Sequence, residues 1–292
     1  MTAYDYLTAF KRNLGFLDKT EQQKLRGARV AVIGLGGTGG AQVHALARLG
    51  IGAFTLADPD VYELINFNRQ IGATMNTIGR AKTAVMAELV HSINPEADIR
   101  LFDQGIGPGN IAEVLEGVDV VVDSLDFYCF KERFLLYRHA RERGLWVVTS
   151  PPLGFGFTLL NFDPQGMSFE DYFGFDEGMD EFELSVSLIA GILPRPWMMR
   201  YLNQDGLDPA AHQLPSVGAA PFMIAGVIAT EVMNLITRKQ PVRAVPEVMQ
   251  FDALLQQFRK LRYPRGMRGP LQQIKKALLR RRLPRPAPAA RP

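Results

Sequence analysis

A short strand that runs into a cluster of glycines and then into a helix constrains this chain more than any other feature. Residues 29–34, RVAVIG, form an apolar run rich in β-branched side chains, which predicts a buried strand. Residues 40–50 carry apolar side chains at helical spacing, so a helix is expected after the glycines. This order of strand, glycine turn and helix is typical of α/β folds that bind nucleotides at the turn.

The same alternation continues through the first half of the chain. Further strands are predicted at 53–57, 98–102, 118–122 and 145–149, and helices at 81–93 and 128–143. Strands that alternate with helices favour a parallel sheet, and right-handed crossovers place helices on both of its faces. The expected fold class is therefore α/β, with a doubly wound, Rossmann-like and mostly parallel sheet.

The second half of the chain differs in composition. Residues 161–215 are rich in proline, glycine, methionine and aromatic residues and contain an acidic cluster, which indicates an inserted loop region. Residues 219–236 predict a strongly apolar helix, and residues 247–262 predict two strands joined by a turn near Ala253, an added antiparallel part. The expected organisation is an N-terminal helical segment (1–27), a nucleotide-binding domain (28–160), an inserted crossover (161–215), a completing part (216–264) and a basic tail (265–292).

Cysteine and histidine usage limits the possible metal chemistry. The 292 residues include one cysteine, Cys129, which is too few for an internal disulfide or a four-cysteine zinc site. The four histidines, His44, His91, His139 and His212, have no metal-ligand spacing, so we predict no zinc. No signal peptide is recognisable, and no apolar run is expected to approach the roughly 18 residues of a membrane span. A cytoplasmic protein without a transmembrane segment is therefore expected.

The charge of the chain is concentrated at its C-terminal end. Residues 265–292 hold nine Lys/Arg and no Asp/Glu, whereas residues 1–264 hold 24 basic and 30 acidic residues. Leu271, Ile274, Leu278 and Leu279 lie at helical spacing among the basic residues, so a short basic amphipathic helix is expected before the proline-rich end. Such a tail can contact RNA or an anionic surface, or remain a solvated extension.

The glycine turn predicts a phosphate-binding loop. Its glycines are Gly34, Gly36, Gly37 and Gly39, which let backbone N–H groups approach a phosphate at the positive end of the following helix. Asp58 follows the second strand, where it can bind ribose hydroxyls. Because the loop also satisfies GxGxxG, an NAD-dependent dehydrogenase and a turn without a ligand remain open at this point.

Four further motifs favour ATP. In chain order they are Asp58-Pro-Asp60, Asn66-Phe-Asn-Arg69-Gln70, Gly79-Arg-Ala-Lys82 and Asp123-Ser-Leu-Asp126. With the glycine loop they resemble the motifs of the ThiF/MoeB family of ubiquitin-activating-enzyme-like adenylyltransferases over roughly residues 12–262. A dinucleotide lacks the terminal phosphate charge that two cations such as Arg69 and Lys82 would neutralise, whereas ATP carries it.

The resemblance implies a role for each of these residues. Asp126 would hold Mg²⁺, which prefers one or two carboxylates together with phosphate oxygens. Asn66 and Arg69 would contact the phosphates, Lys82 their β/γ end, and Asp58 the ribose. The segment Phe10-Lys-Arg12-Asn resembles an N-terminal motif whose arginine reaches the ATP of a partner subunit, which implies a homodimer.

The chain also departs from the family. It has no cysteine in the crossover segment where many relatives carry one, and we expect a buried Cys129 with a raised thiol pKa, unsuited to act as a nucleophile. Phe127 stands where relatives usually carry asparagine. The run from Ser150 to Gly156, with two glycines, can either admit an extended substrate tail or simply connect strands.

Three functions follow from these patterns. The first is ATP-dependent adenylation of the C-terminal carboxylate of a ubiquitin-like or sulfur-carrier protein, without a cysteine thioester. The second is activation of a tRNA-borne carboxylate, because residues 68–71 and 93–96, NRQI and INPE, resemble the branch that dehydrates threonylcarbamoyladenosine. The third is a non-catalytic nucleotide-binding scaffold, which the intact motifs disfavour.

Overall fold

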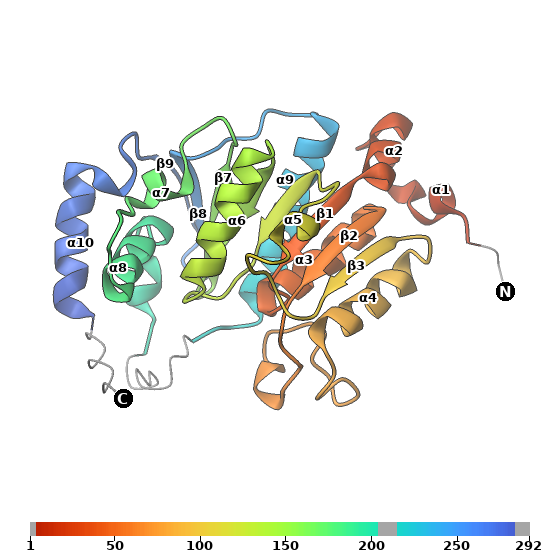
Figure 1. Cartoon of the computed structure of the whole chain (residues 1–292), viewed down its shortest axis with the longest axis horizontal. Coiled ribbons are helices and arrows are strands. Elements are labelled where there is room, and N and C mark those ends of the chain that lie inside the picture. Colours follow the sequence, from red (N-terminus) through yellow and green to blue (C-terminus); the bar gives the residue numbers. More distant parts are fainter. Residues whose placement is uncertain (1–3, 204–214, 284–292) are drawn as a thin grey trace.

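The computed structural model of the chain describes residues 4–203 and 215–283, and a nine-stranded sheet forms its centre (Figure 1). The first part contains α1 (Tyr6–Ala9), η1 (Lys11–Asn13), α2 (Lys19–Gly27), β1 (Arg29–Ile33), α3 (Gly37–Leu49), β2 (Ala53–Ala57), η2 (Leu64–Asn66), α4 (Lys82–Ile93), β3 (Asp98–Phe102), α5 (Ile111–Val114), β4 (Val120–Asp123), α6 (Phe130–Glu142) and β5 (Trp146–Thr149). The second part contains β6 (Pro152–Leu153), β7 (Gly156–Phe162), α7 (Phe169–Phe173), α8 (Glu181–Ile192), η3 (Trp197–Arg200), α9 (Ala219–Thr237), β8 (Glu247–Asp252), β9 (Gln257–Arg262), η6 (Gly266–Arg268) and α10 (Pro270–Arg282).

The strand order is β3-β2-β1-β4-β5-β7-β8-β9, and β6 pairs with β7 beside this path. The pairs from β3 to β5 are parallel, and the pairs from β5 to β9 are antiparallel. The order reverses around β1, since β2 lies on one side of it and β4 on the other. Ligands bind in open α/β sheets at the carboxyl ends of the strands beside such a switch point.

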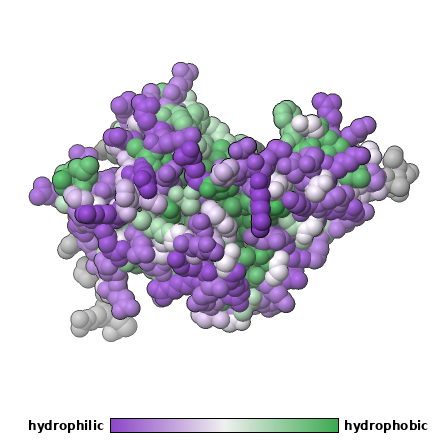
Figure 2. Space-filling view, turned by 90° about the horizontal axis from the view of Figure 1, so that it is seen from above, coloured by the Kyte–Doolittle hydropathy of each residue, from purple (hydrophilic) through white to green (hydrophobic). Residues whose placement is uncertain are grey.

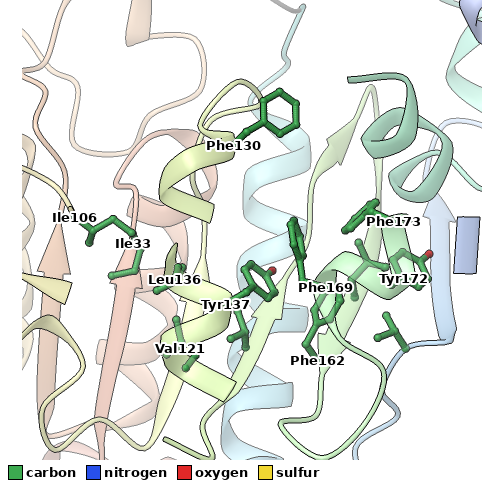
Figure 3. Close-up of a cluster of buried hydrophobic side chains, with 14 of the residues drawn as sticks. Ile33, Ile106, Val121, Phe130, Leu136, Tyr137, Phe162, Phe169, Tyr172 and Phe173 are labelled. Carbon is green, nitrogen blue, oxygen red and sulfur yellow. The ribbon is translucent and has the colours of Figure 1, made fainter. Parts of the chain in front are cut away.

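Two hydrophobic cores cover the two faces of the sheet. Because successive residues of a strand point to opposite faces, Val30 and Val32 of β1 join the core that includes α3, α4 and α9, whereas Ala31 and Ile33 join the core beneath α5, α6 and α7. Figure 3 shows this second core, in which aromatic side chains from α6, β7 and α7 gather. The doubly wound fold with an antiparallel addition is therefore confirmed.

The segment expected as a loop from 161 to 215 contains regular structure that the sequence prediction missed. Strand β7 reaches Phe162 and is buried at every position, and helices α7 and α8 follow it. Each begins at a side-chain cap, since Ser168 accepts a hydrogen bond from the Asp171 N–H and Asp180 from the Glu183 N–H. Asp180 of the expected acidic cluster therefore caps α8. Residues 204–214, which include His212, lie outside the described part.

Helix α9 corrects the expectation about membrane-length segments. It has 19 residues and a mean hydropathy of 1.7, so it is long and apolar enough to cross a membrane by length and composition. The same helix packs against α3 and contributes Ile224, Ile228 and Val232 to a core. A core helix passes the same test, so the length alone is weak support for a span.

The described part of the basic tail forms the expected short helix, α10. It packs against α8, and Arg280 forms an ion pair with Glu183 at 2.7 Å. Residues 284–292, the proline-rich end of the tail, lie outside the described residues.

Candidate nucleotide-binding site

The predicted site residues leave the sheet at one edge. In the strand register Ile33 of β1 lies beside Ala57 of β2 and beside Asp123 of β4. The glycine loop, Asp58 and the loop that carries Asp126 therefore emerge side by side, at the lower edge of the sheet in Figure 1. This is the carboxyl edge of the parallel strands, where the fold class predicts a ligand.

Glycine is required at the positions of this loop for different physical reasons. Gly34 has a φ of +89°, and a Cβ there would lie 2.4 Å from the Ser124 carbonyl oxygen. A Cβ on Gly39 would lie 1.8 Å from the Gly34 carbonyl oxygen, so the turn itself requires both glycines. At Gly36 the nearest atom, Gln70 Nε2, is 3.8 Å from a Cβ. Packing within the chain does not require glycine at 36, but the close approach of a ligand would.

The amino end of α3 fits an anion. Its N-cap is Gly36, which makes no side-chain capping hydrogen bond, and the first N–H groups of a helix have no partner within the helix. A Cβ on Gly37 would lie 3.3 Å from the Arg69 carbonyl oxygen and 3.4 Å from its Cγ. The helix end and the Arg69 segment are therefore neighbours, so backbone N–H groups and a cation occur together beside the turn.

Asp58 fixes the glycine loop. One carboxylate oxygen accepts the Leu35 N–H at 2.6 Å, and the other accepts the Asp60 N–H at 2.8 Å. Burial raises the pKa of the Asp58 carboxyl, although the Leu35 N–H, the Lys82 ammonium and the Asp60 N–H each act to lower it. Asp58 therefore holds the glycine loop in place by accepting a backbone N–H of that loop. It also lies at the end of β2, where the fold class predicts a ribose.

Lys82 is buried, with 5% of its surface exposed. Its ammonium donates to Asp60 Oδ2 at 2.8 Å and lies 3.8 Å from Asp58 Oδ1. Lys82 is therefore not a solvated surface charge, although a single lysine in a sequence usually is. A buried ammonium requires compensation, and Asp60 supplies it with a side chain that is itself more than half exposed. Asp60 is thus more than a turn residue.

Asn66 and Arg69 lie in the segment around η2. Asn66 is 7% exposed, and its side-chain oxygen accepts the Glu63 N–H at 2.9 Å. Arg69 is partly buried, and its Nη1 donates to the Ile65 carbonyl at 3.0 Å and to Asn68 Oδ1 at 2.9 Å. Local hydrogen bonds therefore hold the segment around η2 in place. Both hydrogen bonds of Arg69 come from Nη1.

A buried network that the sequence prediction missed supports the loop carrying Asp126. Asp123 Oδ2 accepts Arg133 Nε at 3.0 Å and the Tyr137 hydroxyl at 3.0 Å. Arg133 Nη2 also donates to the carbonyls of Leu125, at 2.7 Å, and Asp126, at 3.2 Å. Asp123 does not cap the following helix, because the N-cap of α6 is Cys129.

The network leaves Asp126 exposed at the carboxyl edge of the sheet, while Asp123 and Arg133 are only 3% and 7% exposed. Burial lowers the pKa of the Arg133 guanidinium, but Asp123 and the other partners outweigh it and hold the pKa above its usual value. A sequence signal existed, because Arg133 falls on the buried stripe of α6 with Phe130 and Tyr137.

Arg12 lies away from the carboxyl edge of the parallel strands. It is exposed in η1, and its neighbour Asn13 donates to the Leu49 carbonyl at the last turn of α3. Since α3 has 13 residues and rises about 1.5 Å per residue, roughly 20 Å separates this end from the glycine loop. Arg12 therefore lies outside the cluster of site residues of its own chain.

The described part of the chain offers no clustered set of metal ligands. Across residues 4–203 and 215–283, no group of three His, Cys, Asp or Glu side chains is arranged to hold a metal ion. Mg²⁺ does not need such a group, because it often binds one or two carboxylates, water and substrate phosphates. The exposed carboxylate of Asp126 fits that mode.

Comparison with known proteins identifies the family of the chain. The family model described as "ThiF family" matches residues 10–268. The chain belongs to the ThiF family. The resemblance inferred from the five motifs is therefore confirmed.

Curated ThiF-family relatives match different shares of the chain. A "tRNA threonylcarbamoyladenosine dehydratase" of Haemophilus influenzae is 44% identical over 115 residues, 39% of this chain and 44% of the relative. A "Sulfur carrier protein adenylyltransferase" of Thermus thermophilus is 26% identical over 251 residues, 86% of this chain and 84% of the relative. The chain spans about half the length, 44–56%, of the dehydratase relatives that it matches.

A solved structure shares the ThiF-family fold. The structure titled "Crystal structure of E. coli MccB + ATP" has a TM-score of 0.61 and 18% identity, over 84% of this chain and 66% of that chain. At this identity the likeness concerns the fold alone.

Two expected departures from the ThiF-family pattern have structural outcomes. Burial, and then the Asp126 carboxylate, raise the pKa of the half-buried Cys129 thiol, as expected. Gly154 and Gly156 belong to the β6–β7 hairpin, where a Cβ would lie 2.5 Å from the Tyr201 hydroxyl or 2.0 Å from the Phe251 carbonyl oxygen. Chain packing requires both glycines, so the strand-connection alternative accounts for them.

Proposed function

We propose that this chain binds Mg·ATP at the carboxyl edge of its sheet and adenylates a carboxylate. The observation that carries the proposal is the convergence of an uncapped helix end, the buried Lys82 and the Asp126 loop on one edge. The carboxylate oxygen would form a bond to the α-phosphorus of ATP, and the bond from that phosphorus to the bridging oxygen would break. Pyrophosphate would leave with the bonding electrons.

Positive groups are needed because both partners of this reaction are anionic. Backbone N–H groups at the α3 amino end, beside Gly36, would donate to the phosphates, while Arg69 and Lys82 would balance the charge that develops on pyrophosphate. Asn66 would contact the phosphates, and Asp58 the ribose. Asp126 would hold Mg²⁺, which supplies further positive charge when bound. We propose no zinc site.

The proposed enzyme is a cytoplasmic homodimer in which Arg12 completes the partner's site. The exposure of Arg12 and its place at the far end of α3 support this arrangement. The raised pKa of Cys129 argues against a thiolate nucleophile. The acyl-adenylate would therefore pass directly to another acceptor.

The first candidate substrate is the C-terminal carboxylate of a ubiquitin-like or sulfur-carrier protein. The Thermus thermophilus relative supports it, because that match covers most of both chains. The second candidate is a tRNA-borne carboxylate, as in threonylcarbamoyladenosine. The dehydratase relatives favour it by their higher identity, 33–44% over shorter stretches.

ATP–pyrophosphate exchange tests the function and separates the substrates. Exchange that requires a protein ending in glycine supports the first candidate, and exchange that requires tRNA carrying the carboxylate supports the second. Asp126→Ala should abolish exchange in either case, whereas Glu142→Ala, an exposed carboxylate at the far end of α6, should leave it intact. Nucleotide binding without exchange with either substrate would support the scaffold alternative instead.

A further inference from the structure

The C-terminal end of the molecule is strongly basic. Residues 253–292 hold 12 Lys/Arg and no Asp/Glu, which leaves 21 basic and 30 acidic residues in 1–252. The described part of this segment forms β9, η6 and α10, and α10 lies at one end of the molecule, beyond α8 (Figure 1). The C-terminal segment therefore carries an excess of positive charge, part of which pairs with Asp171, Asp176 and Glu183 of the neighbouring α7–α8 region.

Helix α10 is fixed to the body by its charged side. Lys276 is only 2% exposed, and Lys275 Nζ donates to the Ala190 carbonyl of α8 at 2.9 Å. Arg280 and Glu183 form a two-point ion pair, with N–O distances of 2.7 to 3.0 Å. These contacts make the helix part of the folded body.

The opposite side of α10 is apolar and exposed. Leu271, Ile274 and Leu278 are 74%, 59% and 51% exposed, at the i, i+3 and i+7 spacing of one helix face. Arg281 and Arg282 follow them and are also exposed. Figure 2 shows apolar atoms at the end of the molecule where α10 lies. Three basic side chains of the helix, Lys275, Lys276 and Arg280, thus face the body, whereas three aliphatic side chains and the last two arginines face outward.

A binding partner of this face must suit both its exposed aliphatic side chains and the arginines beside them. A second copy of the same face would bring like charges together. An RNA backbone would pair with the arginines but leave three aliphatic side chains against phosphates. An anionic lipid surface accepts both groups, because aliphatic side chains enter the acyl boundary and arginines remain among the headgroups. The convex ridge of a terminal helix can also contact a flat surface along its length.

We propose that the outer face of α10, Leu271, Ile274 and Leu278 with Arg281 and Arg282, docks the protein on an anionic membrane surface. The proposal concerns peripheral binding and does not depend on the enzymatic function.

Co-sedimentation of the full chain with vesicles tests the proposal. Vesicles of phosphatidylglycerol and phosphatidylcholine in equal parts should bind the protein, and phosphatidylcholine alone should bind it far less. Leu278→Gln or Ile274→Gln should weaken partitioning about tenfold each. Arg281→Gln with Arg282→Gln should weaken it by more than tenfold and reduce its dependence on salt.

Matched controls use exposed residues elsewhere. Phe16→Gln removes an 87% exposed apolar side chain outside α10, and Lys24→Gln removes an exposed charge on α2. Neither should change vesicle binding, and ATP–pyrophosphate exchange should be normal in every variant. Absence of binding to anionic vesicles, or binding that the α10 variants do not weaken, would overturn the proposal. Binding to RNA that needs the arginines but not Leu278 would also overturn it.

Discussion

Removing the Arg133 guanidinium should destabilise the protein and release the loop that carries Asp126. In Arg133→Met the Asp123 carboxylate, 3% exposed in the native structure, loses its cation. The Tyr137 hydroxyl remains as a neutral donor. The carbonyls of Leu125 and Asp126 also lose their Arg133 donors at 2.7 and 3.2 Å.

The magnitude follows from the burial of this pair. Leaving one member of a buried ion pair without its partner costs about 3–5 kcal/mol, a large part of the 5–15 kcal/mol stability of an ordinary domain. The melting temperature should fall by roughly 6–20 °C for a domain of this size. Tyr137→Phe removes one neutral donor and should cost only about 1 kcal/mol.

Urea unfolding of a double-mutant cycle measures the effect. Asp123→Asn with Arg133→Met removes both charges, so the double variant should be more stable than the sum of the two single losses implies. The exposed pair Arg138–Glu170, 2.8 Å apart, is a matched control, and Arg138→Met should cost about 1 kcal/mol or less. Additive losses at Asp123 and Arg133, or a loss in Arg133→Met no larger than in Arg138→Met, would refute this account.

The catalytic consequence is separable from the stability loss. At a temperature where Arg133→Met is fully folded, exchange should require a higher Mg²⁺ concentration, because the Asp126 loop is less ordered. Unchanged Mg²⁺ dependence in the folded variant would contradict the positioning role of Arg133.

Further predictions concern the loop, the dimer and α10. The Gly36→Ala variant should keep the native melting temperature and bind ATP more weakly in calorimetry. The Gly39→Ala variant should unfold at a lower temperature, because its Cβ meets the Gly34 carbonyl. Equal losses of melting temperature and of ATP affinity in the two variants would contradict these different roles. Arg12→Ala and Asp126→Ala should each lack exchange activity and recover part of it when mixed, and no recovery would count against action in trans. Burial lowers the pKa of Lys275 to about 8, so the unfolded chain binds the Lys275 proton more tightly than the folded chain. The free energy of unfolding should therefore rise between about pH 8 and 10.5. An identical pH slope in Lys275→Met would contradict this.

The antiparallel part of the sheet was the part of the fold that the local sequence pattern predicted least well. Strand β7 follows a glycine and proline-rich stretch, and its seven residues are apolar enough to suit a buried strand. Composition around it suggested a loop instead. Only pairing with β5 and β8 decides that these residues form a central strand, because strand pairing depends on partners distant in sequence.

The sequence by itself determined the parallel half of the sheet, the ThiF-family motifs and the order in which they occur. It could do so because strand–turn–helix units are local, and because a phosphate-binding loop needs glycines at fixed spacing. The burial of Lys82 between Asp58 and Asp60, and the network of Asp123 with Arg133 and Tyr137, depended on the tertiary structure. The exposure of the aliphatic side of α10 also depended on the tertiary structure. A charged residue has the same helical or turn preference whether buried or solvated, and only the groups packed around it decide which of the two it becomes.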